Sequence, residues 1–354
     1  TLLLDAQPHR RDKTCGDGLT PRAVRQLIEL EVPTEETDGW ARNKGLRIIG
    51  GGMRLQLDWP EVDSFPSYGM VRGREDLDEF LARHAERCGA TLVERRNVTE
   101  PVLDDSGRIV GVVAKVMGAN GRATGERITY RAPVVVAADG VSSRLAVAMG
   151  REKREDRPMG VAVRAYYETP RHTDDYMESH LELWTKSAQD NSDILMPGYG
   201  WLFGVGDGRS NIGLGILNTS EAFGKTDYKD VMRRWVESMP QEWGISEATI
   251  TGPIKSAALP MAFNRQPLYD KGLLLVGDAG VGGVLRSARG GSAAQGSPNR
   301  GRKAPCRGRW IRGGSPGHRP GGSAGRPPGG PGRRSGARWR RRGGARRPRG
   351  APTR

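Results

Sequence analysis

The stretch Gly272-Leu-Leu-Leu-Val-Gly-Asp-Ala-Gly280 decides the fold of this chain, together with Pro133-Val-Val-Val-Ala-Ala-Asp-Gly140 upstream. Each stretch is a short apolar run that ends in Gly and Asp. Buried parallel strands have this form when their carboxyl ends present a carboxylate and a closely approaching backbone to a nucleotide. The alternative is two ordinary core strands followed by turns. Because both stretches occur, in this order, the sequence favours a nucleotide site at the ends of two strands.

The net charge of +15 is the sum of two unlike segments. Residues 281–354 contain 20 of the 56 Lys and Arg residues and none of the 41 Asp and Glu residues, so residues 1–280 carry a net charge of −5. This mildly acidic part is long enough to bury a large core in one or two domains. Its apolar runs are far shorter than the roughly 20 residues of a membrane-spanning helix, and no signal peptide is visible at its start.

The three cysteines, Cys15, Cys88 and Cys306, give neither a disulfide framework nor the spacing of metal ligands. This use of cysteine is typical of a reducing cytoplasm. We therefore expect a cytoplasmic protein without a metal site, and peripheral contact with the inner face of the cell membrane stays open.

The tail at residues 281–354 contains 20 Gly, 9 Pro and no acidic residue. Such a segment cannot bury enough apolar surface to offset its ordering entropy, so we predict disorder. Arginines together with Trp310 and Trp339 would suit a nucleic-acid-binding arm. However, the Arg-Gly-Gly triplets are scattered, and this composition is also what GC-rich codons give in the wrong frame. We favour the out-of-frame origin over a nucleic-acid partner.

The first residues, Thr1-Leu-Leu-Leu-Asp5, have the form of a buried strand with an acid at its tip. In a dinucleotide-binding βαβ unit, such an acid follows the glycine-rich turn by about 20 residues and hydrogen-bonds the adenosine ribose. No Gly-x-Gly-x-x-Gly turn precedes it here, so we expect the first strand and the phosphate-binding loop to be missing. A plain surface role for Asp5 is the alternative.

The rest of the chain alternates between helical and strand patterns. Residues 74–88 have apolar side chains at helical spacing with Gly89 as the C-terminal cap, which places Cys88 in the core. Residues 227–239 predict an amphipathic helix whose apolar stripe serves packing. Strands are predicted at 90–94, 108–116, 127–130, 160–168, 180–184, 199–205 and 211–217, the later ones forming an antiparallel sheet.

The order of the two strand-end motifs resembles the FAD-binding pattern of flavoprotein hydroxylases and their relatives. Three further runs resemble the geranylgeranyl reductase family: Arg11-Asp-Lys-Thr-Cys-Gly-Asp-Gly-Leu19, Arg74-Glu-Asp-Leu-Asp78 and Pro197-Gly-Tyr-Gly-Trp-Leu-Phe203. The segments 15–23, 58–60 and 179–183 are most similar to actinobacterial menaquinone reductases. Two departures stand out. Gly204 replaces a family Pro, which is expected to loosen that strand, and residues 281–286 do not match the family's flavin-contacting helix start.

The resemblance implies an α/β fold, with an FAD/NAD(P)-binding Rossmann domain of the glutathione-reductase type and an inserted antiparallel β-sheet substrate domain. We expect the FAD-binding domain at residues 1–150, the β-rich substrate domain at 151–265, the return strand of the FAD domain at 266–280 and the tail at 281–354. Because the phosphate-binding loop and the helix after Asp278 are missing or replaced, the chain as written is expected to bind FAD weakly.

The resemblance also implies a reductase that uses FAD to saturate isoprenoid C=C bonds of a prenyl lipid, either a menaquinone tail or a geranylgeranyl group. The electron donor, NAD(P)H or ferredoxin, stays open. Cys15 is the candidate for proton transfer, with a small buried residue as the alternative. Tyr199 and Trp201 are candidates for the lining of an apolar tunnel with Phe203, with sheet-core aromatics as the alternative.

For FAD itself, we expect Asp5 at the ribose and Arg74 at the pyrophosphate. The residues expected around the ribityl chain and the phosphates are Asp139, Gly140, Gly277, Asp278 and Ala279. Two other functions stay as alternatives: an FAD-dependent aromatic-ring monooxygenase on the same fold, and a basic nucleic-acid-binding protein that acts through the tail.

Overall fold

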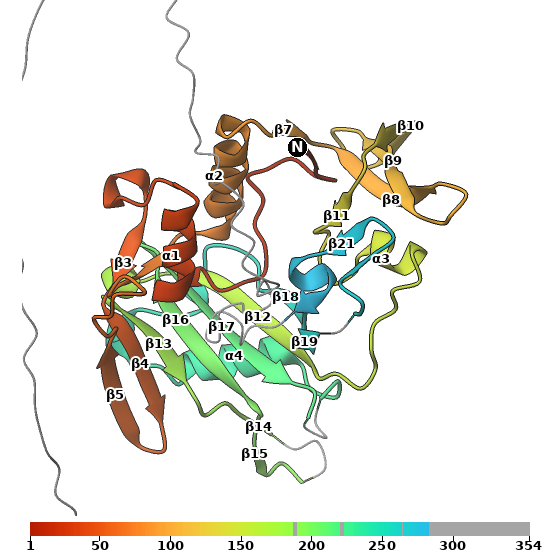
Figure 1. Ribbon diagram of the computed structural model, residues 1–354. Helices are drawn as coiled ribbons and strands as arrows, with labels where there is room; N and C mark the ends of the chain where they lie inside the picture. Colours follow the sequence, from red (N-terminus) through yellow and green to blue (C-terminus); the bar gives the residue numbers. More distant parts are fainter. Residues whose placement is uncertain (187–189, 220–222, 264, 283–354) are drawn as a thin grey trace, which may run out of the picture. The chain divides into compact units, whose positions relative to one another are not determined.

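The computed structural model describes residues 1–282 except 187–189, 220–222 and 264. The expectations about residues 283–354 lie outside the described residues. The described part has a mixed α/β architecture (Figure 1). Its largest sheet has seven strands in the order β18 (Lys255–Pro260), β12 (Met159–Glu168), β17 (Arg209–Leu217), β16 (Gly198–Gly204), β13 (Tyr176–His180), β4 (Gly45–Gly50) and β5 (Met53–Asp58).

Three neighbouring strands of this sheet, β12, β17 and β16, occupy the predicted positions, because their side chains alternate between the two faces of the sheet. β17 pairs antiparallel with both β12 and β16. The strand predicted at 180–184 is wrong, since β13 ends at His180 and a separate strand, β14 (Trp184–Lys186), pairs with β15 (Asp193–Leu195). Between β13 and β14, Leu183 leaves the sheet and is fully buried in the core.

The sheet also includes a hairpin from the N-terminal part of the chain. β4 pairs antiparallel with β5 and lies parallel to β13. The turn is formed by Gly51 and Gly52, whose φ angles of 60° and 72° are those that a tight hairpin turn requires. Two strands of the sheet therefore come from residues 45–58, outside the range 151–265 expected for the β-rich domain.

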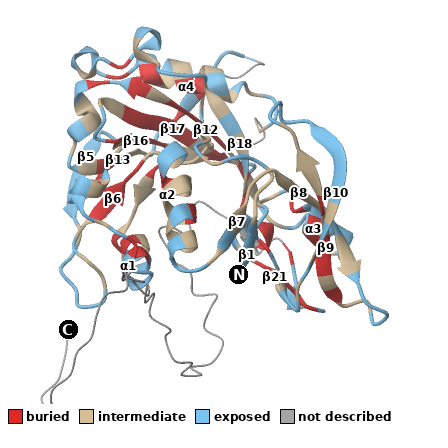
Figure 2. Ribbon diagram, turned by 90° about the horizontal axis from the view of Figure 1, so that it is seen from above, coloured by how far each residue is buried: buried red, intermediate tan, exposed pale blue. Residues whose placement is uncertain are grey.

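Helix α4 (Tyr228–Glu237) covers one face of the sheet, and the buried residues gather beneath it (Figure 2). The helix begins at Asp227, whose carboxylate accepts hydrogen bonds from the backbone N–H groups of Lys229 (2.9 Å) and Asp230 (3.3 Å). Its apolar stripe serves packing, as predicted. Each large side chain buried there contributes about 1.5–3 kcal/mol. This core includes Val163, Tyr167, Leu202, Ile212, Leu214, Ile216, Val231, Met232 and Val236.

The two strands of the nucleotide-type motifs lie side by side, as predicted. β11 (Val135–Ala137) pairs parallel with β21 (Leu273–Leu275), and β20 (Tyr269–Asp270) extends this sheet. A second parallel pair joins β1 (Leu2–Leu4) to β7 (Thr91–Val93), and Leu4 packs against the core of the first pair. The antiparallel strands that follow are β8 (Arg96–Leu103), β9 (Ile109–Met117) and β10 (Ala123–Arg131), with β9 and β10 near the predicted hairpin positions.

The remaining elements are short except for one helix, α2 (Arg74–Arg87). This helix ends at Cys88, and Gly89 follows with the expected positive φ of 93°. The prediction that Cys88 lies in the core is wrong: Cys88 is exposed, because the buried face of α2 is carried by Leu77 and Ala82. The other elements are α1 (Pro21–Glu29), α3 (Arg144–Ala148), β2 (Gly18–Leu19), β3 (Ala41–Asn43), β6 (Gly69–Val71), β19 (Ala262–Phe263) and β22 (Val281–Gly282).

A buried ion network lies on the α4 side of the sheet. Glu178 on β13 is fully buried and accepts hydrogen bonds from Arg47 (2.8 Å), Arg171 (2.9 Å) and His180 (2.8 Å). Although burial opposes ionisation, these donors hold the pKa of Glu178 well below its usual range. The network joins the N-terminal hairpin to the sheet, because Arg47 belongs to β4.

Among the described residues, every helix falls short of the length and apolarity that a membrane-spanning segment requires.

Glu178→Gln is expected to destabilise the protein by about 3–5 kcal/mol, because it leaves two buried guanidinium groups with one carboxylate fewer. Urea unfolding measures this loss as a lower midpoint. Glu182→Gln is the control, since Glu182 is exposed and lies four residues along the chain. Equal midpoints for both variants and the wild type would show that the network adds nothing to stability.

Candidate functional site

Three aromatic side chains share the face of the sheet that α4 does not cover. Tyr199, Trp201 and Phe203 alternate along β16, and Leu202 between them points into the core under α4. The ring centroids are 6.2 Å apart for Tyr199 and Trp201, and 6.4 Å apart for Trp201 and Phe203. The predicted common face is therefore present. Trp201 is only 4% exposed, whereas Tyr199 and Phe203 are half-buried.

The loop that contains Cys15 packs directly on these rings. A Cβ atom at Gly16 would lie 3.1 Å from the Phe203 ring and 3.7 Å from Trp201 Nε1, so glycine allows the backbone to approach closely. The Trp201 ring also packs against Gly213 of β17, where a Cβ atom would lie 2.4 Å from the ring. Trp201 is thus held between two glycines as a core aromatic, and the partly open rings beside it are those of Tyr199 and Phe203.

Asn211 on β17 connects the aromatic face to the loop. Its side-chain oxygen accepts a hydrogen bond from Trp201 Nε1 (2.8 Å), and its Nδ2 donates to the Cys15 carbonyl (3.1 Å) and to Asp17 Oδ2 (2.9 Å). Asn211 is fully buried. Sequence reasoning missed it, although a polar residue at an inward position of an otherwise apolar strand is a usable signal.

Asp17 is the buried acid of the site, and it was also missed. It is 1% exposed, and its Oδ1 accepts a hydrogen bond from the Arg74 backbone N–H (3.2 Å), so it caps the start of α2. Burial raises the pKa of Asp17 to about 6, against the opposing effects of Asn211, Tyr166, Arg164 and Arg74. A carboxyl group with this pKa changes its charge near neutral pH, as acid–base residues of active sites do.

The structure brings Cys15 and Arg74 together with Tyr199. Burial opposes ionisation of Arg74, but Cys15 and Asp78 raise its pKa; Arg74 Nη2 donates to Asp78 Oδ1 at 2.8 Å. Burial, followed by the charge of Cys15, raises the pKa of Tyr199. Cys15 is half-buried and faces the Arg74 guanidinium group.

A buried ion pair holds the start of the same loop. Arg164 on β12 is 1% exposed, pairs with Asp12, and donates to the Lys13 carbonyl at 2.5 Å. Lys255 Nζ lies 2.8 Å from the second oxygen of Asp12. Partial burial opposes ionisation, but the two cations hold the pKa of Asp12 below its usual value. The loop is therefore fixed to the sheet at both of its ends.

The residues predicted around the ribityl chain meet at the ends of β11 and β21. Asp139 and Gly140 follow the carboxyl end of β11, and the turn 277–279 follows the carboxyl end of β21. Gly140 (φ 79°) and Gly277 (φ 57°) have left-handed backbones, and no atom lies within 4 Å of either missing Cβ. Adjacent carboxylates, left-handed glycines and open space beside the backbone fit a flavin nucleotide.

Arg265 holds these two turns together and was not anticipated, since nothing in its local sequence indicates it. Its side chain is 1% exposed and donates to three backbone carbonyls. These belong to Arg151 (2.9 Å), Ala279 (3.0 Å) and Val141 (3.1 Å). One buried guanidinium group therefore sets the spacing of the turns that carry Asp139 and Asp278.

Asp5 lies apart from these turns at the end of β1, in the position expected of a ribose-binding acid. Its Oδ2 accepts a hydrogen bond from Arg11 (2.7 Å), and its Oδ1 from the Gln7 backbone N–H (3.0 Å). A ribose hydroxyl would therefore share this carboxylate with Arg11. Its role at the cofactor stays a prediction.

Gly204 does not loosen β16, contrary to the expectation. It pairs with Ser210 inside the sheet and is buried. A Cβ atom there would lie 2.5 Å from the His172 carbonyl oxygen and 3.0 Å from that of Arg171. Gly204 therefore allows the turn at 170–173 to close on the end of the strand.

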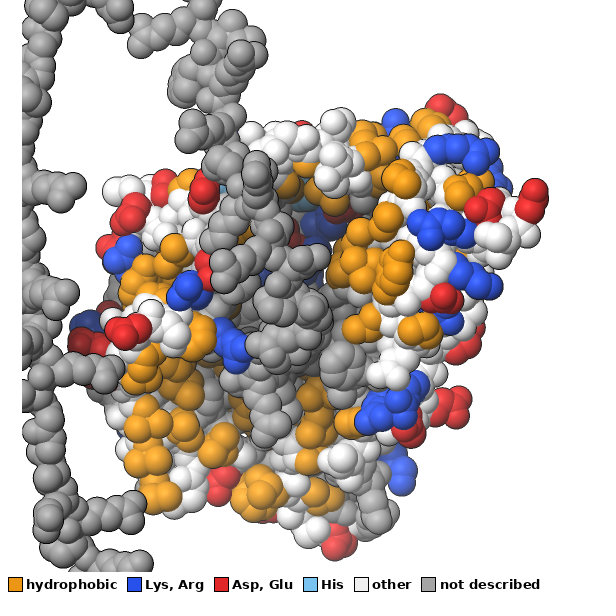
Figure 3. All heavy atoms as spheres, viewed as in Figure 1, with side chains coloured by type: hydrophobic (Ala, Val, Ile, Leu, Met, Phe, Trp, Pro, Cys, Tyr) orange, Lys and Arg blue, Asp and Glu red, His pale blue; other side chains and the backbone are white. Residues whose placement is uncertain are grey.

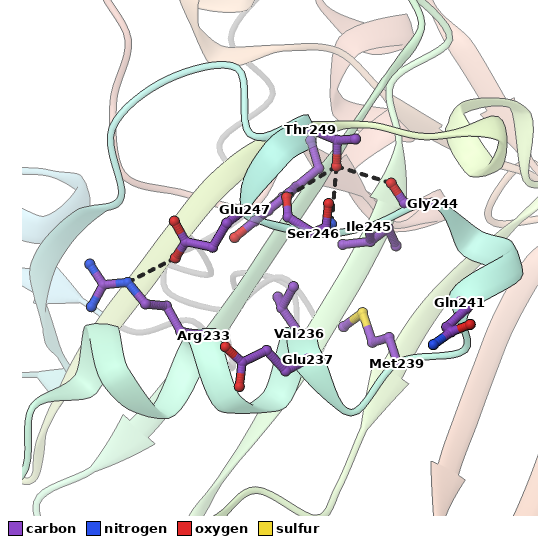
Figure 4. A pocket seen from close by; sticks show the side chains of 11 residues that line it. Arg233, Val236, Glu237, Met239, Gln241, Gly244, Ile245, Ser246, Glu247 and Thr249 are labelled. Atoms are coloured by element: carbon purple, nitrogen blue, oxygen red, sulfur yellow. Dashed lines mark hydrogen bonds and ion pairs between the residues drawn. The ribbon is translucent and has the colours of Figure 1, made fainter.

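A cavity of about 530 Å³ lies between α4 and the turns η3 (Gln241–Trp243) and η4 (Glu247–Thr249) (Figure 4). It is on the α4 side of the sheet, because Tyr167 in its wall alternates with Tyr166 on the aromatic face. Arg233 and Glu247 in its lining form an ion pair (3.0 Å). This cavity is separate from the aromatic face.

The parallel strand ends and their carboxylate turns define the class: an α/β flavoprotein fold with a nucleotide site. The chain belongs to the family described as FAD binding domain, whose model matches residues 1–279. The fold class and the cofactor, FAD, are those expected from the sequence, and both are confirmed.

The relatives agree with the resemblance seen in the sequence. The menaquinone reductase of Mycobacterium tuberculosis (strain ATCC 25618 / H37Rv) is 34% identical over 278 residues, which cover 78% of this chain and 64% of that protein. The digeranylgeranylglycerophospholipid reductase of Methanosarcina acetivorans is 26% identical over 306 residues, covering 83% and 67%. This chain therefore spans less than two thirds of the length of the first relative.

A solved structure shows the same fold. The geranylgeranyl bacteriochlorophyll reductase-like protein from Thermoplasma acidophilum matches with a TM-score of 0.60 and 22% identity, over 79% of this chain and 64% of that one.

Asp17 makes the stability of the protein depend on pH. Its pKa is about 6 in the folded protein, above the ordinary value of 3.8. Between these values the folded state keeps a proton that the unfolded state has released, so its contribution to stability falls as the pH rises, by up to about 3 kcal/mol. Asparagine does not titrate. The urea midpoint of Asp17→Asn should therefore rise relative to that of the wild type between pH 4 and pH 7.

Asp207→Asn serves as the control, because Asp207 is an exposed carboxylate and its loss should leave the wild-type pH dependence in place. A difference between Asp17→Asn and the wild type that stays constant across this range would show that Asp17 does not titrate there.

Proposed function

We propose that this chain forms the FAD-binding and substrate-facing part of a reductase that saturates isoprenoid C=C bonds of a prenyl lipid. The observation that carries the proposal is the packing of the loop 15–18 on the aromatic face of β16. Two segments that resemble geranylgeranyl reductases, far apart in sequence, meet there. The names of the relatives, menaquinone reductase and digeranylgeranylglycerophospholipid reductase, support the same substrate class.

The chemistry requires an acid and apolar surroundings. An isolated alkene has no carbonyl group to hold the charge of an added hydride, so a proton must reach one carbon as the hydride reaches the other. Positive charge then develops on the more substituted carbon. FAD supplies the hydride when it is bound and reduced. Aromatic faces stabilise such positive charge by about 0.5–2 kcal/mol each.

The residues of the aromatic face have different roles in this reduction. Tyr199 and Phe203, which are partly open, contact the alkene, and Trp201 orients them by packing between them. Asn211 fixes the Trp201 ring through its indole N–H. Cys15 contributes to proton transfer beside the Arg74 guanidinium group.

The cofactor is held by the turns at the ends of the parallel strands. Asp139 and Asp278 accept hydrogen bonds from ribityl or ribose hydroxyl groups, and backbone at Gly140, Gly277 and Ala279 approaches the phosphates. Asp5 binds the adenosine ribose, and Arg74 at the start of α2 faces the pyrophosphate.

The same face of the sheet continues to an exposed apolar edge, which suits a long prenyl chain and peripheral contact with a membrane. Trp201 is paired across the sheet with Ser179, Ser179 with Ile48, and Ile48 with Leu55 on the edge strand β5. Figure 3 shows hydrophobic side chains gathered over β4 and β5, where Met53, Leu55 and Leu57 are exposed. Such a patch marks an interaction site.

The test is the conversion of menaquinone by the full chain supplied with chemically reduced FAD in the absence of oxygen. Mass spectrometry should show a product that has gained two hydrogen atoms in its tail. Trp201→Phe should lower the rate about 10-fold or more, because it removes the hydrogen bond that orients the ring. Trp184→Phe is the matched control, since Trp184 is 50% exposed and belongs to another sheet.

An unchanged menaquinone tail in the presence of protein-bound reduced FAD would contradict the proposal. Oxygen uptake driven by NADPH and stimulated by a phenol would instead support the aromatic monooxygenase alternative.

A further inference from the structure

A small surface pocket is lined by Tyr166 and by the start of α2, the helix that Asp17 caps. The pocket measures about 280 Å³ and lies beside the start of α2. Glu75, Asp76 and Asp207 in its lining are exposed, so the pocket opens to solvent. Tyr166, which is half-buried, also lines it.

The hydroxyl group of Tyr166 lies next to Asp17. Tyr166 and Asn211 are directly opposite each other on β12 and β17, so both side chains rise from the same face. A Cβ atom at Gly73 would lie 3.7 Å from the Tyr166 hydroxyl oxygen, and the next residue, Arg74, donates its backbone N–H to Asp17.

This hydroxyl group is available for a proton relay. It is buried and makes no hydrogen bond of normal geometry among the described residues. Burial and the carboxylate of Asp17 both raise the pKa of Tyr166, so the phenol keeps its proton. A buried hydroxyl group without a hydrogen-bond partner destabilises the folded state. The position of Tyr166 between the solvent pocket and Asp17 suits a proton relay.

We propose that Asp17 stores the proton consumed when a double bond is saturated, and that Tyr166 refills it from the pocket. The inference rests on the proposed function and names the acid of that reaction. The O–H bond of the Asp17 carboxyl group breaks, the alkene π bond breaks, and one carbon gains this proton while the other gains a hydride from reduced FAD. The carboxylate then takes the Tyr166 proton as the tyrosine oxygen takes one from pocket water.

The groups that face Asp17 support both of its charge states. Arg74 on α2 and Arg164 on β12 favour the carboxylate, as do the hydrogen bond from Asn211 and the nearby hydroxyl group of Tyr166. Burial favours the neutral acid. Cys15, on the same loop, faces Arg74. Burial outweighs the opposing effects and brings the pKa of Asp17 to about 6, so the group can release and regain a proton within one turnover, as general acids do.

The first test needs no reductase activity. The carboxylic-acid band of Asp17 is followed by infrared titration of the full chain, with Asp17→Asn identifying the band. Tyr166→Phe should raise the pKa of Asp17, because it removes the nearby hydroxyl group, which favours the carboxylate. Tyr167→Phe is the matched control, since this neighbouring tyrosine points to the opposite face. An Asp17 titration that is the same in Tyr166→Phe and in the wild type would overturn the refilling route.

The second test uses the menaquinone assay. Asp17→Asn should lower kcat by about 10²–10⁴-fold with KM little changed, and should remove the fall in kcat as the pH rises through about 6. Tyr166→Phe should lower kcat and increase its solvent deuterium isotope effect. A folded, FAD-bearing Asp17→Asn protein with wild-type kcat and pH profile would overturn the inference.

The two tests separate failure of the inference from failure of the proposed function. A protein that shows the Asp17 titration and its shift in Tyr166→Phe but leaves every prenyl chain unreduced would contradict the proposed function. If Asp17→Asn does not fold, Tyr166→Phe tests the same relay in both assays.

Discussion

The hydrogen bond from Asn211 to Asp17 is the contact on which the rest of the site depends. It joins the loop after the first strand to the central sheet, and the same Asn211 side chain holds the Trp201 indole and the Cys15 carbonyl. All of these groups lie in a region from which water is largely excluded, so each lost partner leaves a polar group unsatisfied. A hydrogen bond to a carboxylate contributes about 1.5–3 kcal/mol, and it acts together with the Arg164–Asp12 ion pair at the start of the loop.

Close backbone approach is the second constraint. Gly16 and Gly213 allow the loop and the sheet to contact opposite sides of the Trp201 ring, and Gly204 lets a neighbouring turn close on the end of β16. The motifs themselves show the same constraint, because Gly18 lies against Met177 and Phe203 and Gly200 lies against Trp235. The aromatic side chains provide the surface, and the glycines determine how near the loop and its acid come to that surface. A methyl group at Gly204 or Gly213 would collide with neighbouring backbone, and one at Gly16 would press on the Phe203 ring.

The sequence predicted the parts of the fold that depend on periodicity. The paired strands ending at Asp139 and Asp278, the alternating strands of the sheet and helix α4 were found because apolar side chains repeat with the period of their element. Asp17, Asn211 and Arg265 were missed because their roles depend on contacts between segments far apart in sequence. Cys88 was placed in the core because its spacing fits α2, but its side chain is exposed at the end of the helix.

Thiol labelling tests whether a prenyl chain lies on the aromatic face beside the loop 15–18. Cys15 is half-buried at this face, whereas Cys88 is exposed at the end of α2 and serves as a reference within the same molecule. The alkylation rates of the two cysteines are measured by mass spectrometry with and without a menaquinone. We predict that the ligand slows alkylation of Cys15 and leaves that of Cys88 unchanged. Equal rates at Cys15 with and without a saturating prenyl ligand would contradict the account.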